Sequence, residues 1–273
     1  MQLRTRVTAI VCLAFILVAA PAYAQRGFGR VFSDPATGET YRVEVGGFLW
    51  SATPDIAVTS ESLGIVGSTI DFVEDLGIEQ KTFRQLKVAL RPGRKHKLRF
   101  EYTPISWTEE TRLNRTVIFN GQRFDVSLPV LAELEWKAMR FAYEWDFIYR
   151  DRGFVGLVLE AKYTDVEAAL ENVLIGREFV AARAPIPAIG IIGRGYVAAN
   201  VSITGEFTGF RLPDVDEEYQ GTYYDFDLYG TVNFSDNFGA QLGYRRLSVF
   251  YRVEEDEGDL KLKGLYFGGV VRF

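Results

Sequence analysis

Few side chains in this sequence have the chemistry of a catalytic or metal-binding group. The chain contains one histidine, His96, which lies between Lys95 and Lys97. Neighbouring positive charges disfavour the protonated imidazole that a histidine acid–base catalyst must form. The single cysteine, Cys12, lies in an apolar run near the N-terminus, so we expect no disulfide, thiolate metal site or cysteine nucleophile. We therefore expect a protein without catalytic residues, cofactors or metal ions.

Carboxylates and glycines offer three further signals, each with a simpler interpretation. Asp225 and Asp227 could act as an acid–base pair, but the polar face of any strand produces the same spacing. The glycine-rich stretch 190–195 lacks the strand–loop–helix context and the Lys-Ser/Thr pair of a phosphate loop. Acidic residues in 214–218 and 254–259 offer the oxygen ligands that Ca²⁺ and Mg²⁺ prefer, without an ordered ligand spacing. We interpret these segments as strand residues and solvated loops.

The C-terminal residues have the pattern of a β-strand, the kind of element that positions most of the polar side chains. Apolar residues recur in even steps at Leu265, Phe267, Val271 and Phe273, and Arg272 falls between the last two. Such alternation is typical of a strand with one face toward lipid and the other toward a polar interior. A closed barrel is the β structure that leaves no unpaired edge in hydrocarbon. We therefore expect an all-β fold, a transmembrane antiparallel up-and-down β-barrel.

The same alternation recurs along the chain in segments whose connections are alternately short and long. The predicted strands are 41–51, 80–91, 96–107, 134–149, 154–166, 185–196, 200–210, 221–233, 238–252 and 260–273. This pattern predicts ten strands, with eight as the alternative, and each strand supplies the roughly 9–11 tilted residues that cross a bilayer. The short connections contain turn-forming residues and are assigned to the periplasm, where an even strand count also places both termini.

The long connections are then assigned to the extracellular side. They are 52–79, 108–133, 167–184, 211–220 and 254–259. In the second of them, Asn120-Gly121 predicts a β-hairpin over 117–124, because Asn-Gly favours a two-residue turn.

Counting in steps of two assigns the side chains of each strand to one of two faces. In 96–107, Leu98 and Phe100 point toward lipid, while Lys97 and Arg99 point inward. Charge is thereby confined to the lumen. The charged residues predicted to line the lumen are Arg42, Glu44, Lys87, Arg99, Glu101, Arg140, Glu144, Asp146, Glu160, Lys162, Arg194, Glu206, Asp225, Asp227 and Arg245. Positive and negative charges nearly balance, which favours ion pairs across the lumen over a channel selective for one sign.

The N-terminus predicts export. An apolar run over 7–20 follows two arginines and precedes Ala22 and Ala24, which form the small-x-small cleavage site of a secretory signal peptide. We expect residues 1–24 to be the signal peptide and residues 25–273 to be a single barrel domain. The formal net charge of −5 makes nucleic acid an unsuitable partner.

The signal peptide, the alternation of short and long connections and the final segment 265–273 resemble small bacterial outer-membrane β-barrel proteins of the OmpA/OmpW-like group. The resemblance implies residence in the outer membrane of a Gram-negative-type bacterium, in contact with its lipid and lipopolysaccharide. It also implies insertion by the outer-membrane assembly machinery, which reads the final strand, here through Leu265, Phe267, Val271 and Phe273. It implies no substrate, and this chain departs from the eight-stranded members of the group.

A largely filled lumen follows from the size of the barrel. Eight strands are just filled by side chains and sixteen leave an aqueous pore, so ten strands with many long charged side chains should be mostly filled. We expect a non-enzymatic protein with a structural or surface-interaction role, in which loops 52–79 and 108–133 would contact an extracellular ligand. The alternative is a narrow porin-like channel for small or amphipathic solutes. An outer-membrane enzyme is the third hypothesis, disfavoured because His96 lies at a predicted periplasmic turn.

Overall fold

The computed structural model describes residues 36–59, 67–127, 129–212, 219–253 and 256–273. The predicted signal peptide, with Ala22 and Ala24, and the acidic segments 214–218 and 254–255 lie outside the described residues. No helix within the described part of the chain has the length and apolar character of a membrane-spanning helix.

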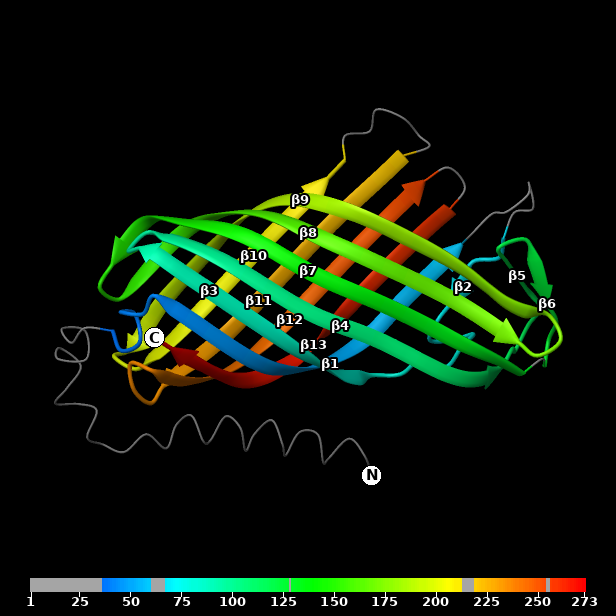
Figure 1. Cartoon of the computed structure of the whole chain (residues 1–273), viewed down its shortest axis with the longest axis horizontal. Coiled ribbons are helices and arrows are strands. Elements are labelled where there is room, and N and C mark those ends of the chain that lie inside the picture. The colour runs from blue at the N-terminus through cyan, green and yellow to red at the C-terminus, as the bar shows by residue number, and fades with distance from the viewer. Residues whose placement is uncertain (1–35, 60–66, 128, 213–218, 254–255) are drawn as a thin grey trace, which may run out of the picture.

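Ten long antiparallel strands of the described chain form one closed sheet (Figure 1). They are β1 (Val43–Thr59), β3 (Lys81–Gly93), β4 (His96–Arg112), β7 (Pro129–Arg150), β8 (Gly153–Asn172), β9 (Gly176–Ala198), β10 (Val201–Arg211), β11 (Tyr219–Asn233), β12 (Phe238–Val253) and β13 (Asp256–Arg272). Each long strand pairs with the long strands before and after it, and β13 pairs with β1, which closes the barrel with Glu44 opposite Arg272. The predicted up-and-down barrel is confirmed, with ten strands and not eight.

The connections distinguish the two ends of the barrel. The short connections 94–95, 151–152, 199–200 and 234–237 lie at one end, called here the turn end. The first described residues and the C-terminus also lie at the turn end (Figure 1). The opposite end, called the loop end, carries three short strands, β2 (Ile70–Asp71), β5 (Val117–Phe119) and β6 (Gln122–Phe124).

The strands extend farther toward the loop end than the sequence predicted. β8 and β9 continue into a hairpin with the three-residue connection 173–175, so the predicted loop 167–184 is wrong. Apolar residues continue the inward face of β8 through this stretch, which keeps the intervening polar residues on a strand. The predicted loops 52–79, 108–133, 211–220 and 254–259 shorten to 60–80, 113–128, 212–218 and 254–255.

The outer surface of the barrel changes character along its axis. In the half nearer the turn end, outward side chains such as Phe141, Leu159 and Leu228 are apolar and exposed, and they form an apolar belt. A band of this composition is what a barrel presents to lipid. Closer to the loop end the belt gives way to a charged ring, whose exposed members include Arg84, Lys137, Arg183, Arg246 and Lys263.

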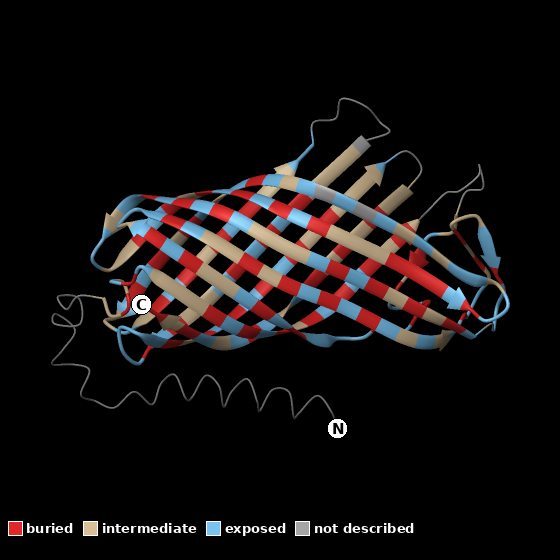
Figure 2. Ribbon diagram, in the orientation of Figure 1, coloured by how far each residue is buried: buried red, intermediate tan, exposed pale blue. Residues whose placement is uncertain are grey.

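The interior changes in the opposite sense. Charged side chains fill the lumen inside the belt, whereas the interior beyond the ring is an apolar core that includes Trp50, Trp107, Trp136 and Leu262. Buried and exposed residues alternate along the strands on both sides of the ring (Figure 2). Beyond the ring the outer surface meets water, so the inward face becomes an ordinary hydrophobic core. The expectation that charge is confined to the lumen is therefore wrong for the loop end.

A small cap closes the apolar core at the loop end. Phe72 and Leu76, near β2, and Phe119 and Phe124, from the β5–β6 hairpin, belong to this core and are almost fully buried. The hairpin turns at Asn120 and Gly121, whose φ angles are 49° and 76°, as a type I′ turn requires. The hairpin predicted over 117–124 is thus present.

An ion pair fixes the cap. Arg115 contacts both carboxylate oxygens of Asp75, at 2.9 and 2.6 Å. Burial opposes ionisation of Asp75, but the hydrogen bonds from Arg115 and from the backbone of Asp71 outweigh it and lower the pKa of Asp75.

Candidate functional site

The charged lumen is the candidate functional site because it gathers nearly all of the residues selected from the sequence. The predicted lumen residues that lie inside the barrel, buried or half-buried, are Glu44, Lys87, Arg99, Glu101, Arg140, Glu144, Asp146, Glu160, Lys162, Arg194, Glu206, Asp225, Asp227 and Arg245. Arg42 is the exception, and its predicted position is wrong. It precedes β1 and is exposed, while its neighbour Tyr41 is buried, so the strand alternation does not extend back to residue 42.

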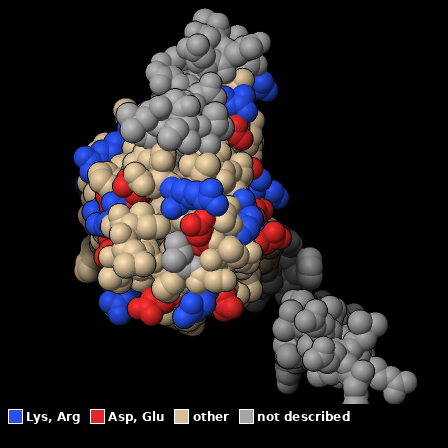
Figure 3. Space-filling model, turned by 90° about the vertical axis from the view of Figure 1, so that its right-hand side faces the viewer, with Lys and Arg blue, Asp and Glu red and all other residues tan. Residues whose placement is uncertain are grey.

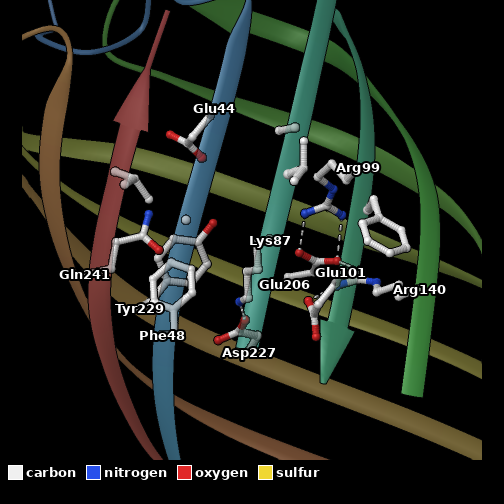
Figure 4. A pocket seen from close by; sticks show the side chains of 15 residues that line it. Glu44, Phe48, Lys87, Arg99, Glu101, Arg140, Glu206, Asp227, Tyr229 and Gln241 are labelled. Carbon is white, nitrogen blue, oxygen red and sulfur yellow. Dashed lines mark hydrogen bonds and ion pairs between the residues drawn. The ribbon is translucent and has the colours of Figure 1, made fainter. Parts of the chain in front are cut away.

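The centre of the site is a set of bonds across the barrel axis. Arg99 on β4 donates two hydrogen bonds to Glu206 on β10, at 2.7 and 2.8 Å, in the parallel geometry that makes Arg–carboxylate pairs strong (Figure 4). Arg140 on β7 also bonds Glu206 and lies 2.5 Å from Glu160 on β8. Because β4 and β10 lie on opposite walls, these contacts cross the lumen.

A second group of ion pairs lies toward the apolar core. Arg245 donates to both oxygens of Asp225, at 3.0 and 2.7 Å, and also bonds Glu101 on the opposite wall. Lys162 contacts the same Asp225 at 2.8 Å and Glu160 at 2.9 Å. Glu160 is also bound by Arg140, so the two groups form one continuous lattice.

The lattice continues toward the turn end. The ammonium group of Lys97 lies 2.5 Å from Glu144 and 3.1 Å from Asp146, and it stands 3.6 Å from the centre of the Phe154 ring. Arg99 contacts Glu144 at 3.2 Å and so joins this group to the central one. Nearly every carboxylate is held by at least one cation, which offsets part of the free energy lost on removing these charges from water.

A small cavity of about 60 Å³ interrupts the lattice (Figure 4). On one side Lys87 lies 3.1 Å from Asp227, which also accepts a hydrogen bond from the Tyr266 hydroxyl at 2.8 Å. The ammonium group of Lys87 lies 4.7 Å from the centre of the Tyr266 ring. The charged groups in its lining and this volume suit a few water molecules and exclude a larger solute.

Residues 37–42, called here the N-terminal strap, close the turn end, and residues 37–40 of the strap were not identified from the sequence. Thr37 accepts a hydrogen bond from Asn233 at 2.6 Å, and Glu39 binds Arg194 at 2.9 Å and the Tyr196 hydroxyl at 2.8 Å. Gly38 between them has φ +83°, and a Cβ there would lie 2.6 Å from Arg272. The strap therefore requires glycine at this position.

The strap carboxylate is held in its charged form. Burial opposes ionisation of Glu39, but the charges of Arg194 and Lys97 and the hydrogen bonds from Arg194 and Tyr196 outweigh it and lower the pKa of Glu39 to about 2. Arg91 adds a further contact at 3.4 Å.

Two buried arginines were also missed, although a signal for each was present. Arg91 shares the inward parity of Lys87 on β3, and Arg272 shares that of Tyr266 on β13. Arg272 is 1% exposed and binds Glu44 at 2.5 Å and Asn233 at 2.7 Å across the closing seam. Arg91 lies beside the turn at 94–95, whereas Arg272 falls on the polar side of the alternation that the sequence shows in 265–273.

The remaining sequence candidates lie on the outer surface. Leu265, Phe267 and Phe273 of the predicted assembly signal are exposed, and Val271 is half-buried. His96 lies near the turn end, and its Nδ1 is 2.7 Å from the Tyr143 hydroxyl. Within the described ranges, no group of three or more His, Cys, Asp or Glu residues is placed to hold a metal ion.

Comparison with known proteins identifies the fold. No protein-family model matches this chain, and no curated protein sequence does either. The outer-membrane protease OmpT of Escherichia coli superposes with a TM-score of 0.60 at 8% identity, over 88% of this chain and 99% of that one. The toluene transporter TodX of Pseudomonas putida gives 0.36 at 9% identity, over 90% and 94% of the two chains. Ail of Yersinia pestis, solved with the heparin analogue sucrose octasulfate, gives 0.37 at 9% identity, over 85% and 99%. The likeness to OmpT shows an outer-membrane β-barrel fold, as the sequence resemblance implied.

Proposed function

We propose that this protein is a non-enzymatic barrel of the outer membrane of a Gram-negative-type bacterium, with a structural or surface-interaction role and a lumen closed by its own ion pairs. The lattice centred on Arg99, Arg140 and Glu206 carries this proposal, because it joins opposite walls across the axis. The turn end, where the first described residues and the C-terminus lie, would face the periplasm, and the loop end would face the exterior.

The filled interior supports closure over conduction. Cavities of about 60 and 20 Å³ lie within the lattice, and the apolar core lies above it. An ion passing along the axis would have to displace paired charges and then enter a hydrophobic interior, which is strongly unfavourable. A narrow channel would need a continuous hydrated path past these residues.

The surface role would belong to the loop end. The cap packs on the apolar core, and the described parts of the two connections, 67–80 and 113–127, lie above the charged ring. Lysine, arginine and acidic side chains are interspersed on this end of the barrel (Figure 3). Such a mixed-charge surface suits contact with lipopolysaccharide or an extracellular ligand. The exposed apolar residues of β13 would be read by the outer-membrane assembly machinery.

Planar-bilayer recording tests closure. We expect the wild-type barrel to show no large stable conductance, and Arg99→Ala to show brief openings because Glu206 loses one of its two cross-lumen partners. Arg183→Ala, which removes an exposed outer arginine, should behave as the wild type. A large, stable and ion-selective wild-type conductance would overturn the proposal in favour of the channel.

A further inference from the structure

One wall of the barrel has an unpaired strand edge near the loop end. β9 begins at Gly176, but its pairing with β10 reaches only Ile189, opposite Gly209. Residues 176–188 pair with β8 on one edge, and among the described residues no strand pairs with the other edge. In Figure 1, β9 runs on toward the loop end beyond β10.

Two prolines disfavour the pairing of a further strand with this edge. Pro185 and Pro187 lie two residues apart in the unpaired stretch, so the backbone nitrogens of both face the same side of the strand. Proline is tolerated in a sheet where its missing N–H faces an unpaired edge. An added strand would find no donors at these positions, so the edge resists closure by further pairing.

A cavity of about 320 Å³ lies against this edge. Its lining is mainly apolar and comes from three parts of the wall: Trp136, Thr164 and Val166 of β7 and β8; Val180, Ala181, Arg183 and Ile186 of β9; and Val249, Tyr251, Val253, Asp256 and Leu260 of β12 and β13. Its volume falls within the range of about 300–1,000 Å³ that is typical of small-molecule sites.

The lining residues show where the cavity opens. Val180 and Ile186 belong to the inward set of β9, whereas Ala181 and Arg183 are exposed and belong to the outward set. A cavity that touches both faces of one strand extends around the edge of that strand. The opening therefore lies along the unpaired edge of β9, beside the charged ring.

The cavity is closed toward the turn end. Trp136 and Thr164 line it from one side and also line the 20 Å³ cavity next to Lys162 and Arg245. The charge lattice therefore lies directly beneath the apolar lining. A molecule that enters from the edge of β9 therefore cannot pass on into the charge lattice.

We propose that this cavity binds one hydrocarbon chain, which enters along the edge of β9 with its polar end left at the charged ring. The apolar lining from Val180, Val249 and Leu260 would remove the chain from water, which is the main driving force for such binding. Arg183 at the mouth is largely exposed and lies 2.9 Å from Asp165, so polar contacts are available at the opening. The chain could belong to a membrane lipid or to a free amphiphile, since both present the same chemistry.

Photolabelling of the full barrel in phosphatidylcholine vesicles tests the site. The probe is palmitic acid that carries a diazirine, with labelled residues mapped by peptide mass spectrometry. We expect labelling of Val180, Ile186 and Val249 that excess unlabelled palmitic acid suppresses at least fivefold. Labelling of belt residues such as Leu242 and Phe267 should not be suppressed, because it reports only the surrounding lipid.

Substitutions at the mouth give the matched comparison. Ala181→Trp should lower labelling of the cavity at least fivefold, while Val173→Trp, at a 99% exposed site of the same hairpin, should leave it unchanged. Heat-modifiable migration on gels checks that each barrel is folded, and Ile186→Phe replaces Ala181→Trp if that variant fails. Cavity labelling that neither unlabelled palmitic acid nor the folded variants reduce would overturn the proposal.

A second arm identifies the source of the chain. Vesicles that contain phosphatidylcholine with a diazirine acyl chain replace the free fatty acid. Cavity labelling by this lipid assigns the site to membrane lipid tails, and cavity labelling by palmitic acid alone assigns it to free amphiphiles. The absence of cavity labelling by both probes would contradict the proposal, whether or not the lumen conducts ions.

Discussion

Arg99 and Glu206 lie 107 residues apart in sequence and are joined by two parallel hydrogen bonds across the barrel axis. Glu206 is buried and Arg99 is half-buried. The pair therefore links β4 to β10 across the lumen. Its removal should affect the stability of the whole barrel and not of one strand.

Removal of Arg99 alone should cause a large loss of stability. Arg99→Ala should lower the free energy of unfolding by about 3–5 kcal/mol, because buried carboxylates then lose a cation. Arg183→Ala, which breaks an exposed ion pair with Asp165 on the same barrel, should cost about 0.2–1 kcal/mol. Reversible urea unfolding in lipid vesicles measures both. Similar losses for the two variants would show that the lumen charges are solvated and unpaired.

The outward face of β7 is apolar in the belt and charged beyond the ring. Substitution by arginine should therefore cost more stability in the belt than beyond the ring. Phe141→Arg, in the apolar belt of β7, should destabilise the barrel by about 2–4 kcal/mol, since an arginine then faces lipid. Glu135→Arg, on the same face of β7 but beyond the charged ring, should change stability by about 0.5 kcal/mol or less. Urea titration in vesicles separates the two. Equal effects would place the membrane boundary elsewhere on the barrel.

Loss of the aromatic ring of Phe273 should impair assembly of the barrel. Phe273→Ala keeps the backbone bonds by which its carbonyl accepts from Arg42 and Val43, but removes the exposed ring. We expect a lower yield of heat-modifiable barrel in outer-membrane fractions, and a yield near wild type for Phe273→Tyr. A wild-type yield for Phe273→Ala would count against recognition of this ring by the assembly machinery.

The strap carboxylate predicts a dependence on acid pH. The pKa of Glu39 falls from an ordinary 4.5 to about 2 in the folded protein, so the ionised group favours the folded state fully above pH 4.5. That stabilisation, on the order of 3 kcal/mol, is lost as the pH falls from 4.5 toward 2. Melting temperatures of wild type and Glu39→Gln should differ above pH 4.5 and converge toward pH 2. A constant difference across this range would exclude Glu39 as the cause.

The alternation of side chains predicted correctly which residues face inward in the belt. It did not predict the character of the two faces beyond the charged ring. Within the belt, Lys97 and Arg99 lie inside and Leu98 and Phe100 outside, as the spacing predicts. Alternation shows which residues share a face, but not which face is inside. Trp136 and Lys137 reverse the usual assignment because the outer solvent there is water.

Contacts between segments that are distant in the chain could not be predicted from the sequence. The ion pairs of Arg194 depended on the strap, since its partner is Glu39 and not a strand carboxylate. Residues 37–42 have no periodicity, and their position follows from bonds to Asn233 and Asp236 at the far end of the chain. The prolines of β9 did carry a signal for an unpaired edge, but only once the length of the strand was known.

The seam between β1 and β13 has a consequence for the timing of folding. Glu44 and Arg272 meet across 228 residues, whereas the other pairings of long strands join neighbours in the chain. Bringing such distant segments together is the slowest kind of step, because loop entropy is lost before any contact forms. Ring closure should therefore come last, and no intermediate that lacks β13 can shield both of its open edges. A chain stalled before the seventeen residues of β13 would be an aggregation-prone open sheet and not a smaller barrel.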